Sequence, residues 1–346
     1  MTPEIARLAP DQEPGQAWPT TWEALQTRLA PRFRRAEVRA RVGRYVAGLL
    51  GPVERKNGWQ LAEYLGEPGP QGVQRLLTAA AWDAEAVRDD LRAYVIDHLG
   101  DESGVLILDE TGFLKKGSKS AGVARQYSGT AGGQANQQIG VFLAYASAHG
   151  VAFLDRALYL PASWADDRER CAAAGIPATV PFATKGQLAQ AMLERAFAAQ
   201  VPARWVVGDT VYGTDELRQW LEAQGQSYIL GVPGTHLIWS VGRQEEAQTL
   251  AAALPENAWT RLSAGEGSQG PRWDDWACLG LPSESTPGMA HWLLVRRRCS
   301  DPTDLAYSRV YGPADTTVPE MVRVAGRRWA IETGFEHAKG EVGLDH

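Results

Sequence analysis

The chain has 346 residues, of which 44% are hydrophobic and 22% charged, and its formal net charge is −6. This composition is typical of a globular protein with room for two or three domains, and no apolar run reaches the roughly eighteen residues of a membrane span. A polar start predicts that there is no secretory leader. Three distant cysteines without a C-x-x-C pair predict free thiols in a cytoplasmic protein, with neither a zinc site nor disulfides.

The first hundred residues divide into an arm and a helical domain. Residues 1–20 contain four prolines and predict an irregular arm. Residues 21–100 space apolar side chains three and four positions apart, which predicts helices. The pattern fits a DNA-binding helix-turn-helix unit, and it fits a small helical bundle without DNA contact equally well.

A run of arginines lies inside this helical domain. The negative net charge argues mildly against a nucleic-acid partner, but six arginines between residues 32 and 44 accompany a single acid, Glu37. Such a run is either a solvated helix face or a basic footprint on a phosphate backbone. For the second interpretation, the candidate DNA contacts are Arg34, Arg35 and Arg41.

The pattern changes over residues 101–235. Short β-branched and aromatic runs are bounded there by glycine, proline and polar residues, and helical patterns follow over residues 185–199 and 214–225. Strands that alternate with helices predict an α/β fold, with a mixed sheet flanked by helices.

The last third of the chain contains two further parts. Residues 236–312 are rich in tryptophan, glycine and proline and predict a β-rich insertion. Strands are expected there over residues 258–265, 272–282 and 291–299. Residues 313–346 return to a helical pattern that begins at Val318.

Two acids follow apolar strands in the same way. Asp109 comes directly after the run 105–108, and Asp209 comes directly after the run 205–208. Ligands of open α/β sheets bind at the carboxyl ends of the strands, so the two carboxylates are candidates for one site. The alternative is that each Asp forms a turn or a helix N-cap. Glu110 should point to the opposite face from Asp109, because side chains alternate along a strand.

A third acid lies in the C-terminal helical pattern. Arg328, Glu332 and Lys339 are four and seven residues apart, which predicts one face of a helix, although a solvated stripe of charges has the same spacing. Three carboxylates would form an oxygen-rich pocket of the kind that Mg²⁺ prefers. Two ions in such a pocket can activate an attacking oxygen and stabilise the leaving one in phosphodiester displacement.

Three segments together carry a resemblance to a known family. They are "LILDETGFLKKGSKSAGVARQYSGTAG", "WVVGDTVYG" and "RRWAIETGFEHAKGEVGLDH". They resemble the DDE transposases of bacterial insertion sequences, in the branch that has a DETG motif, a D-x-x-Y-G motif and a Y-x2-R-x3-E-x6-K signature. The likeness runs from about Phe33 to the last residue.

The resemblance implies a ribonuclease H-like catalytic core in which Asp109, Asp209 and Glu332 bind Mg²⁺ or Mn²⁺, with two ions expected. The implied reaction is metal-dependent strand cleavage at insertion-sequence ends, followed by attack of the 3′-OH on target DNA. The implied partner is double-stranded DNA, both the terminal inverted repeats and the target. A homodimer on paired ends and a location at the nucleoid in the bacterial cytoplasm are also expected.

The resemblance also bears on the basic and aromatic residues near the motifs. Arg328 and Lys339 match the basic positions of the signature, which contact DNA in the family. Tyr212, in the D-x-x-Y-G motif, is expected either to pack or to contact DNA. Lys115 and Lys116 are candidate phosphate contacts, with a solvated loop as the alternative.

The sequence departs from the family pattern in two places. Ala325 occupies the position of the signature tyrosine. Relatives continue with further helix beyond the position of His346, so we expect this chain to be a fragment or a degenerate copy. Two alternatives to a transposase follow: a two-metal DNA nuclease that cuts without joining, and an inactive truncated form that only binds DNA.

Overall fold

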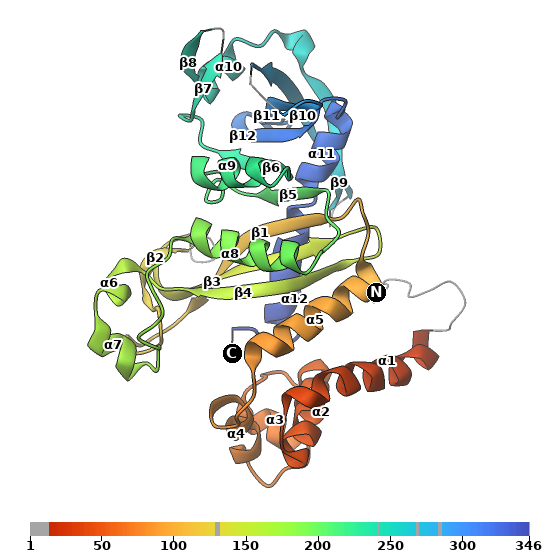
Figure 1. The fold of residues 1–346 in the computed structure, drawn as a ribbon, viewed down its shortest axis with the longest axis vertical. Helices are drawn as coiled ribbons and strands as arrows, with labels where there is room; N and C mark the ends of the chain where they lie inside the picture. Colours follow the sequence, from red (N-terminus) through yellow and green to blue (C-terminus); the bar gives the residue numbers. More distant parts are fainter. Residues whose placement is uncertain (1–13, 129–131, 241, 268–269, 283–285, 346) are drawn as a thin grey trace. The chain divides into compact units, whose positions relative to one another are not determined.

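A computed structural model describes residues 14–128, 132–240, 242–267, 270–282 and 286–345 (Figure 1). The chain divides into two compact units. One contains Met1–Leu99 with Glu332–His346, and the other contains Gly100–Ile331. Within the described ranges, no helix is long and apolar enough to cross a membrane.

The first unit is helical in its N-terminal part. Its elements are α1 (Pro14–Leu29), the 3₁₀ turn η1 (Ala30–Arg32), α2 (Ala36–Leu50), α3 (Gly58–Tyr64), α4 (Gln71–Thr78) and α5 (Ala84–Leu99). Leu61, Ala62 and Val73 form a small buried cluster between α3 and α4. The expected irregular arm over residues 1–20 is too long, because α1 begins at Pro14; residues 1–13 lie outside the described residues.

The second unit is built on a ten-stranded sheet. The strands of this sheet are β1 (Val105–Leu114), β2 (Ala124–Ser128), β3 (Gly133–Ala146), β4 (Val151–Tyr159), β5 (Trp205–Gly208), β6 (Ser227–Val232), β9 (Thr260–Gly267), β10 (Gly270–Leu281), β11 (Met289–Arg298) and β12 (Asp301–Pro313). Their order is β2-β3-β1-β5-β6-β12-β11-β10-β9, and β4 pairs with β3. The pairs β1–β5 and β5–β6 are parallel and the other pairs are antiparallel, which confirms the predicted α/β architecture with a mixed sheet.

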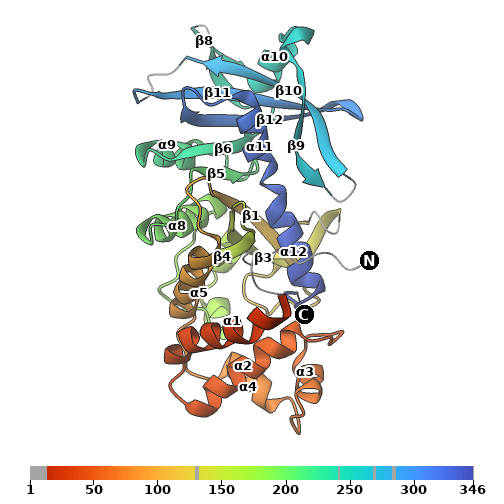
Figure 2. The ribbon, with the colours of Figure 1, turned by 90° about the vertical axis from the view of Figure 1, so that its right-hand side faces the viewer.

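The helices of this unit lie between strands in the sequence, except α11, which follows the last strand. They are α6 (Ala162–Ala165), α7 (Arg168–Ala173), α8 (Lys185–Ala198), α9 (Asp215–Ala223), α10 (Ala247–Ala252) and α11 (Val318–Gly326), with the 3₁₀ turn η2 (Glu256–Ala258). A capping box between Thr184 and Gln187 starts α8, close to the predicted boundary. Ala189, Met192 and Leu193 are fully buried, and α8 packs against β3 and β4 (Figure 2).

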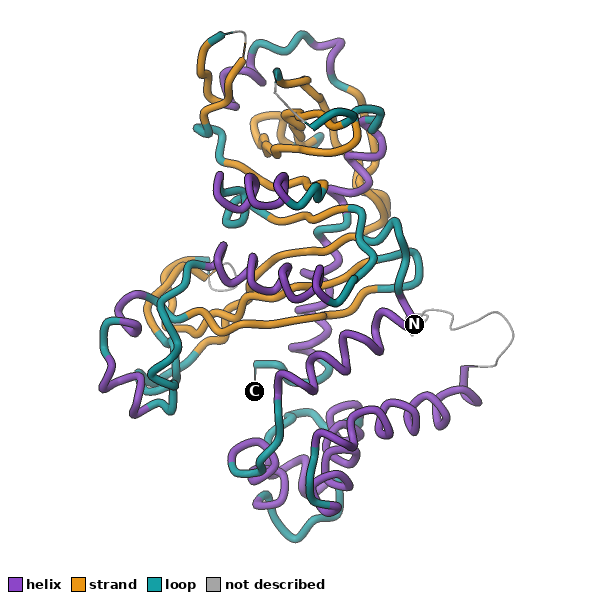
Figure 3. The backbone as a smooth tube through the Cα atoms, viewed as in Figure 1, coloured by secondary structure: helices purple, strands orange, loops and turns teal. Residues whose placement is uncertain are grey.

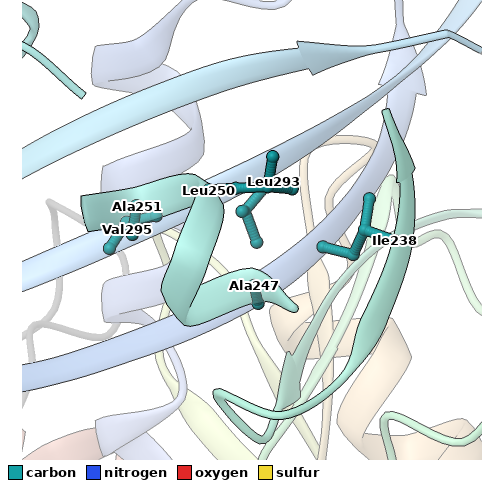
Figure 4. Close-up of a cluster of buried hydrophobic side chains, with 6 residues drawn as sticks. All are labelled: Ile238, Ala247, Leu250, Ala251, Leu293 and Val295. Carbon is teal, nitrogen blue, oxygen red and sulfur yellow. The ribbon is translucent and has the colours of Figure 1, made fainter. Parts of the chain in front are cut away.

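The segment 236–312 contributes strands to the same sheet. Its strands β9–β12 continue the sheet beyond β6, because β12 pairs with β6. A separate hairpin, β7 (Leu237–Ser240) with β8 (Arg243–Glu246), lies beside it (Figure 3). The hairpin and α10 pack on β11 through a buried apolar cluster, which Figure 4 shows: Ile238, Ala247, Leu250, Ala251, Leu293 and Val295.

The C-terminal helical pattern forms two helices, α11 and α12 (Trp329–Gly340). The expectation of one helix that carries Arg328, Glu332 and Lys339 on one face is therefore wrong, since Arg328 precedes α12. The break follows Gly326, where a Cβ atom would lie 1.7 Å from the carbonyl oxygen of Ala264 in β9. The N–H groups of Arg327 and Arg328 bond to carbonyls three residues back, which tightens the turn there.

Candidate active site

The two candidate aspartates lie at the same level of two neighbouring parallel strands: Asp109 is within β1, and Asp209 comes directly after β5. Leu108 of β1 pairs with Gly208 of β5, so the next residues along the chain, Asp109 and Asp209, come side by side where β5 ends. The strands that lead there are buried: Leu108 is fully buried and Val207 is 1% exposed. The apolar runs thus fix two backbones whose first polar residues come side by side.

One oxygen of each carboxylate is used locally. Oδ1 of Asp109 accepts a hydrogen bond of 2.8 Å from the N–H of Glu110, and Oδ1 of Asp209 accepts one of 2.9 Å from the N–H of Val211. The turn-forming role that was the alternative for these acids therefore accounts for one oxygen of Asp209, whereas Asp109 lies within β1 and forms no turn. Oδ2 of Asp109 lies 3.4 Å from Nη1 of Arg328.

Burial changes the acidity of this pair. Removal from water raises the pKa of Asp109 to about 7, in spite of the opposing effects of the Glu110 N–H and Arg328. Burial also raises the pKa of Asp209, and the negative charge of Glu110 adds to the shift. The neighbouring negative charges at this edge increase the cost of ionising either aspartate. We call Asp109, Glu110 and Asp209 the acidic edge.

Glu110 is held by two buried or half-buried donors. Its Oε1 accepts a hydrogen bond of 2.7 Å from Nζ of Lys185, the first residue of α8, and its Oε2 accepts one of 2.5 Å from the hydroxyl of Tyr212. Glu110 thus contacts a different set of residues from Asp109, in line with the expected alternation. The Lys185 ammonium also lies 5.7 Å from the ring centre of Tyr159.

Of the two expected roles of Tyr212, packing and contact with DNA, its full burial supports packing and contradicts the contact with DNA. Burial and the Glu110 carboxylate raise the pKa of Tyr212 far above its ordinary value, so it remains a hydrogen-bond donor. The glycine that follows it has a steric reason: a Cβ on Gly213 would lie 1.7 Å from the carbonyl oxygen of Gly231. The D-x-x-Y-G motif therefore closes a turn against β6 and holds Glu110.

Lys185 was not predicted as a residue of this site. Its position follows from the capping box that starts α8, and a lysine at the beginning of a helix is not distinctive. Tyr212 had a weak signal, since it lies three residues after Asp209, but the pattern did not show that its partner would be Glu110.

Asp209 is one of the residues that line a cavity of about 450 Å³. Arg328 lines it, as do Ala325 and the aromatic residues Trp276, Tyr307 and Trp329. Three further arginines line its wall: Arg272, Arg296 and Arg298. The guanidinium of Arg328 also lies 5.2 Å from the ring centre of Trp329. Cationic and aromatic side chains of this kind suit a single nucleic-acid strand, whose phosphates and bases they can contact.

Glu332 and Lys339 belong to the other compact unit, so the three-carboxylate site stays a prediction. Among the described residues, no group of three or more acidic, histidine or cysteine side chains is arranged to hold a metal ion. Glu332 lies in the first turn of α12 and is half-buried. Burial lowers the pKa of Lys339.

The arginine run of the first unit is partly neutralised by acids. Arg41 lies 3.6 Å from Glu67, and Arg32 lies 2.6 Å from Asp90. Arg34 and Arg35 are exposed, and the ion pairs found in the described ranges do not include them. These contacts leave both interpretations of the run open: a solvated face and a DNA footprint.

Two family models and one curated relative match this chain, and the two models together match residues 28–346. A family model described as a DDE superfamily endonuclease matches residues 28–255, and one described as a transposase DDE domain matches residues 183–346. The probable transposase for insertion sequence element IS701 of Microchaete diplosiphon is 25% identical over 308 residues, which cover 86% of this chain and 73% of that protein. The chain belongs to the DDE superfamily of transposases.

Proposed function

We propose that the protein cleaves phosphodiester bonds at the ends of an insertion sequence and transfers the 3′-OH ends into target DNA. In this proposal the acidic edge belongs to a ribonuclease H-like core, and Asp109, Asp209 and Glu332 are its catalytic carboxylates. The observation that carries the proposal is the pair of half-buried aspartates that lie side by side on neighbouring parallel strands, in a chain of the DDE superfamily.

The residues at the acidic edge fit a divalent cation. Their donors are carboxylate oxygens, which Mg²⁺ and Mn²⁺ prefer. The raised pKa of Asp109 reflects an ionised form that lacks sufficient compensation, and a dication beside Asp109 and Asp209 would stabilise that form. Two such ions would, when bound, activate the attacking oxygen and stabilise the leaving oxygen.

The side chains around the acids have distinct tasks in this proposal. Lys185 and Tyr212 hold the Glu110 carboxylate away from Asp109, so Glu110 remains outside the ligand set. Arg328 balances the charge of Asp109 and can bind a DNA phosphate when a cation takes its place beside that carboxylate. The arginines and aromatic rings of the adjoining cavity hold the strand end at Asp209.

Further DNA contacts are part of the proposal. Arg34, Arg35 and Arg41 of the first unit and Lys339 of α12 are proposed to bind DNA phosphates. A homodimer that acts on paired ends completes it. The support for these points is the exposure of Arg34 and Arg35 together with the family to which the chain belongs.

The test uses a supercoiled plasmid that carries the repeats flanking the coding sequence. The protein is expected to nick this plasmid in Mg²⁺ or Mn²⁺ and to give strand-transfer products on a second plasmid. The variants D109N, D209N and E332Q are expected to lose both reactions and to retain end binding. Nicking without joined products would support a nuclease, and the absence of any metal-dependent nicking by the intact chain would support a protein that only binds DNA.

A further inference from the structure

The second compact unit carries a stretch of chain without acidic residues. No aspartate or glutamate stands between Glu110 and Asp155, in a protein whose net charge is −6. The stretch contains four cationic side chains at its beginning: Lys115, Lys116, Lys119 and Arg125. This local charge is opposite to that of the whole chain, so it calls for its own explanation.

These cations lie at the outer end of β1 and on the loop that follows. β1 ends at Leu114, and β2, which begins at Ala124, is the edge strand of the sheet. Lys116, Lys119 and Arg125 are exposed. Large apolar side chains are exposed beside them, since 70% of Tyr127 and 55% of Leu114 is accessible to solvent. We call residues 115–127 the anchored basic loop.

The backbone of this loop is held on one side by two side chains of β3. Nδ2 of Asn136 in β3 donates hydrogen bonds of 2.7 Å to the carbonyl of Lys115 and 2.9 Å to that of Gly117. Nε2 of Gln138, also in β3, donates one of 2.7 Å to the carbonyl of Ala121. The loop's lysines therefore project from a backbone that is held at both ends of its first turn.

Segments α6 and α7 hold the other side of the loop. Nη2 of Arg170 donates hydrogen bonds to the carbonyls of Ser118, at 3.0 Å, and Val123, at 3.3 Å. The indole N–H of the fully buried Trp164 donates to the carbonyl of Val123 as well, at 2.7 Å. Val123, Trp164 and Cys171 form a buried apolar cluster under these bonds. Such anchoring reduces the conformational entropy that a ligand has to remove on binding.

We propose that the anchored basic loop binds the phosphate backbone of duplex DNA that extends away from the acidic edge. The inference rests on the proposed function, and it adds the surface along which the DNA runs. β1 connects the two places directly, because five residues separate Asp109 from Leu114 and a strand rises about 3.3 Å per residue, or roughly 17 Å in all. DNA that is cut at the acidic edge would pass the loop a few phosphates further on.

The chemistry of the loop matches a DNA backbone. Lysine ammonium groups and the hydroxyls of Ser118 and Ser120 are donors to phosphate oxygens, and neither reads the base sequence. The exposed ring of Tyr127 can pack on deoxyribose. The adjoining helix α7 contains Glu169 and has Asp167 as its N-cap, so the DNA is expected to lie on the β1–β2 side of the loop.

The experiment measures binding of a fluorescent duplex to the full chain by anisotropy, over a range of salt concentrations. The variant K115A/K116A/K119A removes three phosphate contacts. The slope of log affinity against log salt is expected to fall by about 2.7, and affinity at moderate salt is expected to fall on the order of tenfold. A matched control, R204A/R243A/R261A, removes equal charge from side chains that are 46%, 74% and 63% exposed, and it is expected to change both quantities much less.

A second variant tests the anchoring without a change of charge. N136A removes the two bonds to the carbonyls of Lys115 and Gly117, and it is expected to lower the affinity for DNA several-fold while thermal unfolding shows that the protein is folded. Equal losses in the lysine variant and the arginine control would overturn the proposal. If the lysine variant lost binding to anionic lipid vesicles while its binding to DNA was unchanged, the ligand of the loop would be a membrane surface and the proposal would be wrong.

The outcomes separate this inference from the proposed function. The variant D109N/D209N is expected to bind the duplex with wild-type affinity and to lose nicking. If that holds and the lysine variant binds DNA normally, the loop proposal is wrong and the catalytic proposal stands. If the lysine variant loses binding and the intact protein never nicks DNA, the loop proposal stands alone.

Discussion

The segment from Asp109 to Lys119 carries opposite charges at its two ends, in different environments. At its more buried end, in the middle of β1, Asp109 and Glu110 are half-buried, and each carboxylate has a cationic neighbour, Arg328 or Lys185. At its exposed end, in the loop after β1, Lys116 and Lys119 are solvated. Buried charge raises the free energy of the folded chain unless it is compensated, whereas exposed charge costs little. The acids therefore depend on specific cationic neighbours in the folded protein, whereas the lysines require only that the backbone of their loop is held in place.

The largest expected difference between the two ends is catalytic. D109N replaces a proposed metal ligand with a neutral side chain of the same shape, so nicking is expected to fall on the order of a thousandfold or more. K116A, in the loop after β1, should nick at a rate within a few-fold of wild type when DNA is saturating. Rates of plasmid nicking in Mn²⁺ measure both. Full nicking activity of D109N would show that Asp109 is not a catalytic carboxylate.

The pH dependence of stability is the second difference. The folded chain raises the pKa of Asp109 from 3.8 to about 7, so the folded protein holds that proton more tightly than the unfolded one does. The stability gained from this proton is complete below pH 3.8 and is lost as the pH rises through about 7.

The measurement is the free energy of unfolding of wild type and D109N across that pH range, without divalent cations. Wild type is expected to lose stability relative to D109N as the pH rises, and Mn²⁺ should restore it above pH 7. Parallel pH profiles of the two proteins would show that Asp109 is not perturbed. K116A should follow the wild-type profile throughout.

A smaller difference concerns hydrogen bonds at the buried end. E110A leaves the hydroxyl of the fully buried Tyr212 without its acceptor, which is expected to cost about 1–3 kcal/mol of unfolding free energy. Y212F removes only one of the two donors to Glu110 and should cost less. Urea unfolding checks both values. Wild-type stability of E110A would mean that the contact with Tyr212 contributes nothing.

The smallest expected effect sharpens the comparison from the exposed side. K116A and K119A should each change the free energy of unfolding by no more than about 0.5 kcal/mol, as is usual for exposed positions. Urea unfolding under the same conditions as for E110A makes the two ends directly comparable. A loss of several kcal/mol in either variant would show that the lysine has a structural role.

Local patterns predicted the parts of the fold that local physics determines. The apolar runs before Asp109 and Asp209 predicted the start of β1 and both bounds of β5, although β1 continues to Leu114, and the helical pattern predicted α8. The strand β12 was missed, because its first residues are polar and its alternation becomes clear only from Leu305 onward. The break after Gly326 depends on the approach of β9, which is distant in sequence.

The same distinction holds for the candidate site. That two aspartates come at one sheet edge followed from strand patterns, since parallel neighbours bring their ends together. The contacts of Glu110 with Lys185 and Tyr212 depend on how α8 and the turn after β5 pack, and no spacing in the sequence encodes this. The burial of Tyr212 is of the same kind, which is why the sequence left packing and contact with DNA as alternatives and only the structure supports packing.

The most direct test of the proposed catalytic carboxylates is metal-dependent nicking of a plasmid that carries the flanking repeats. Nicking is measured for the intact chain, D109N, D209N and E332Q over a Mn²⁺ titration. We predict nicking that saturates with Mn²⁺ in the intact chain and is lost in all three variants, although each still binds the DNA ends. Nicking by D109N or D209N at rates near those of the intact chain would contradict this prediction.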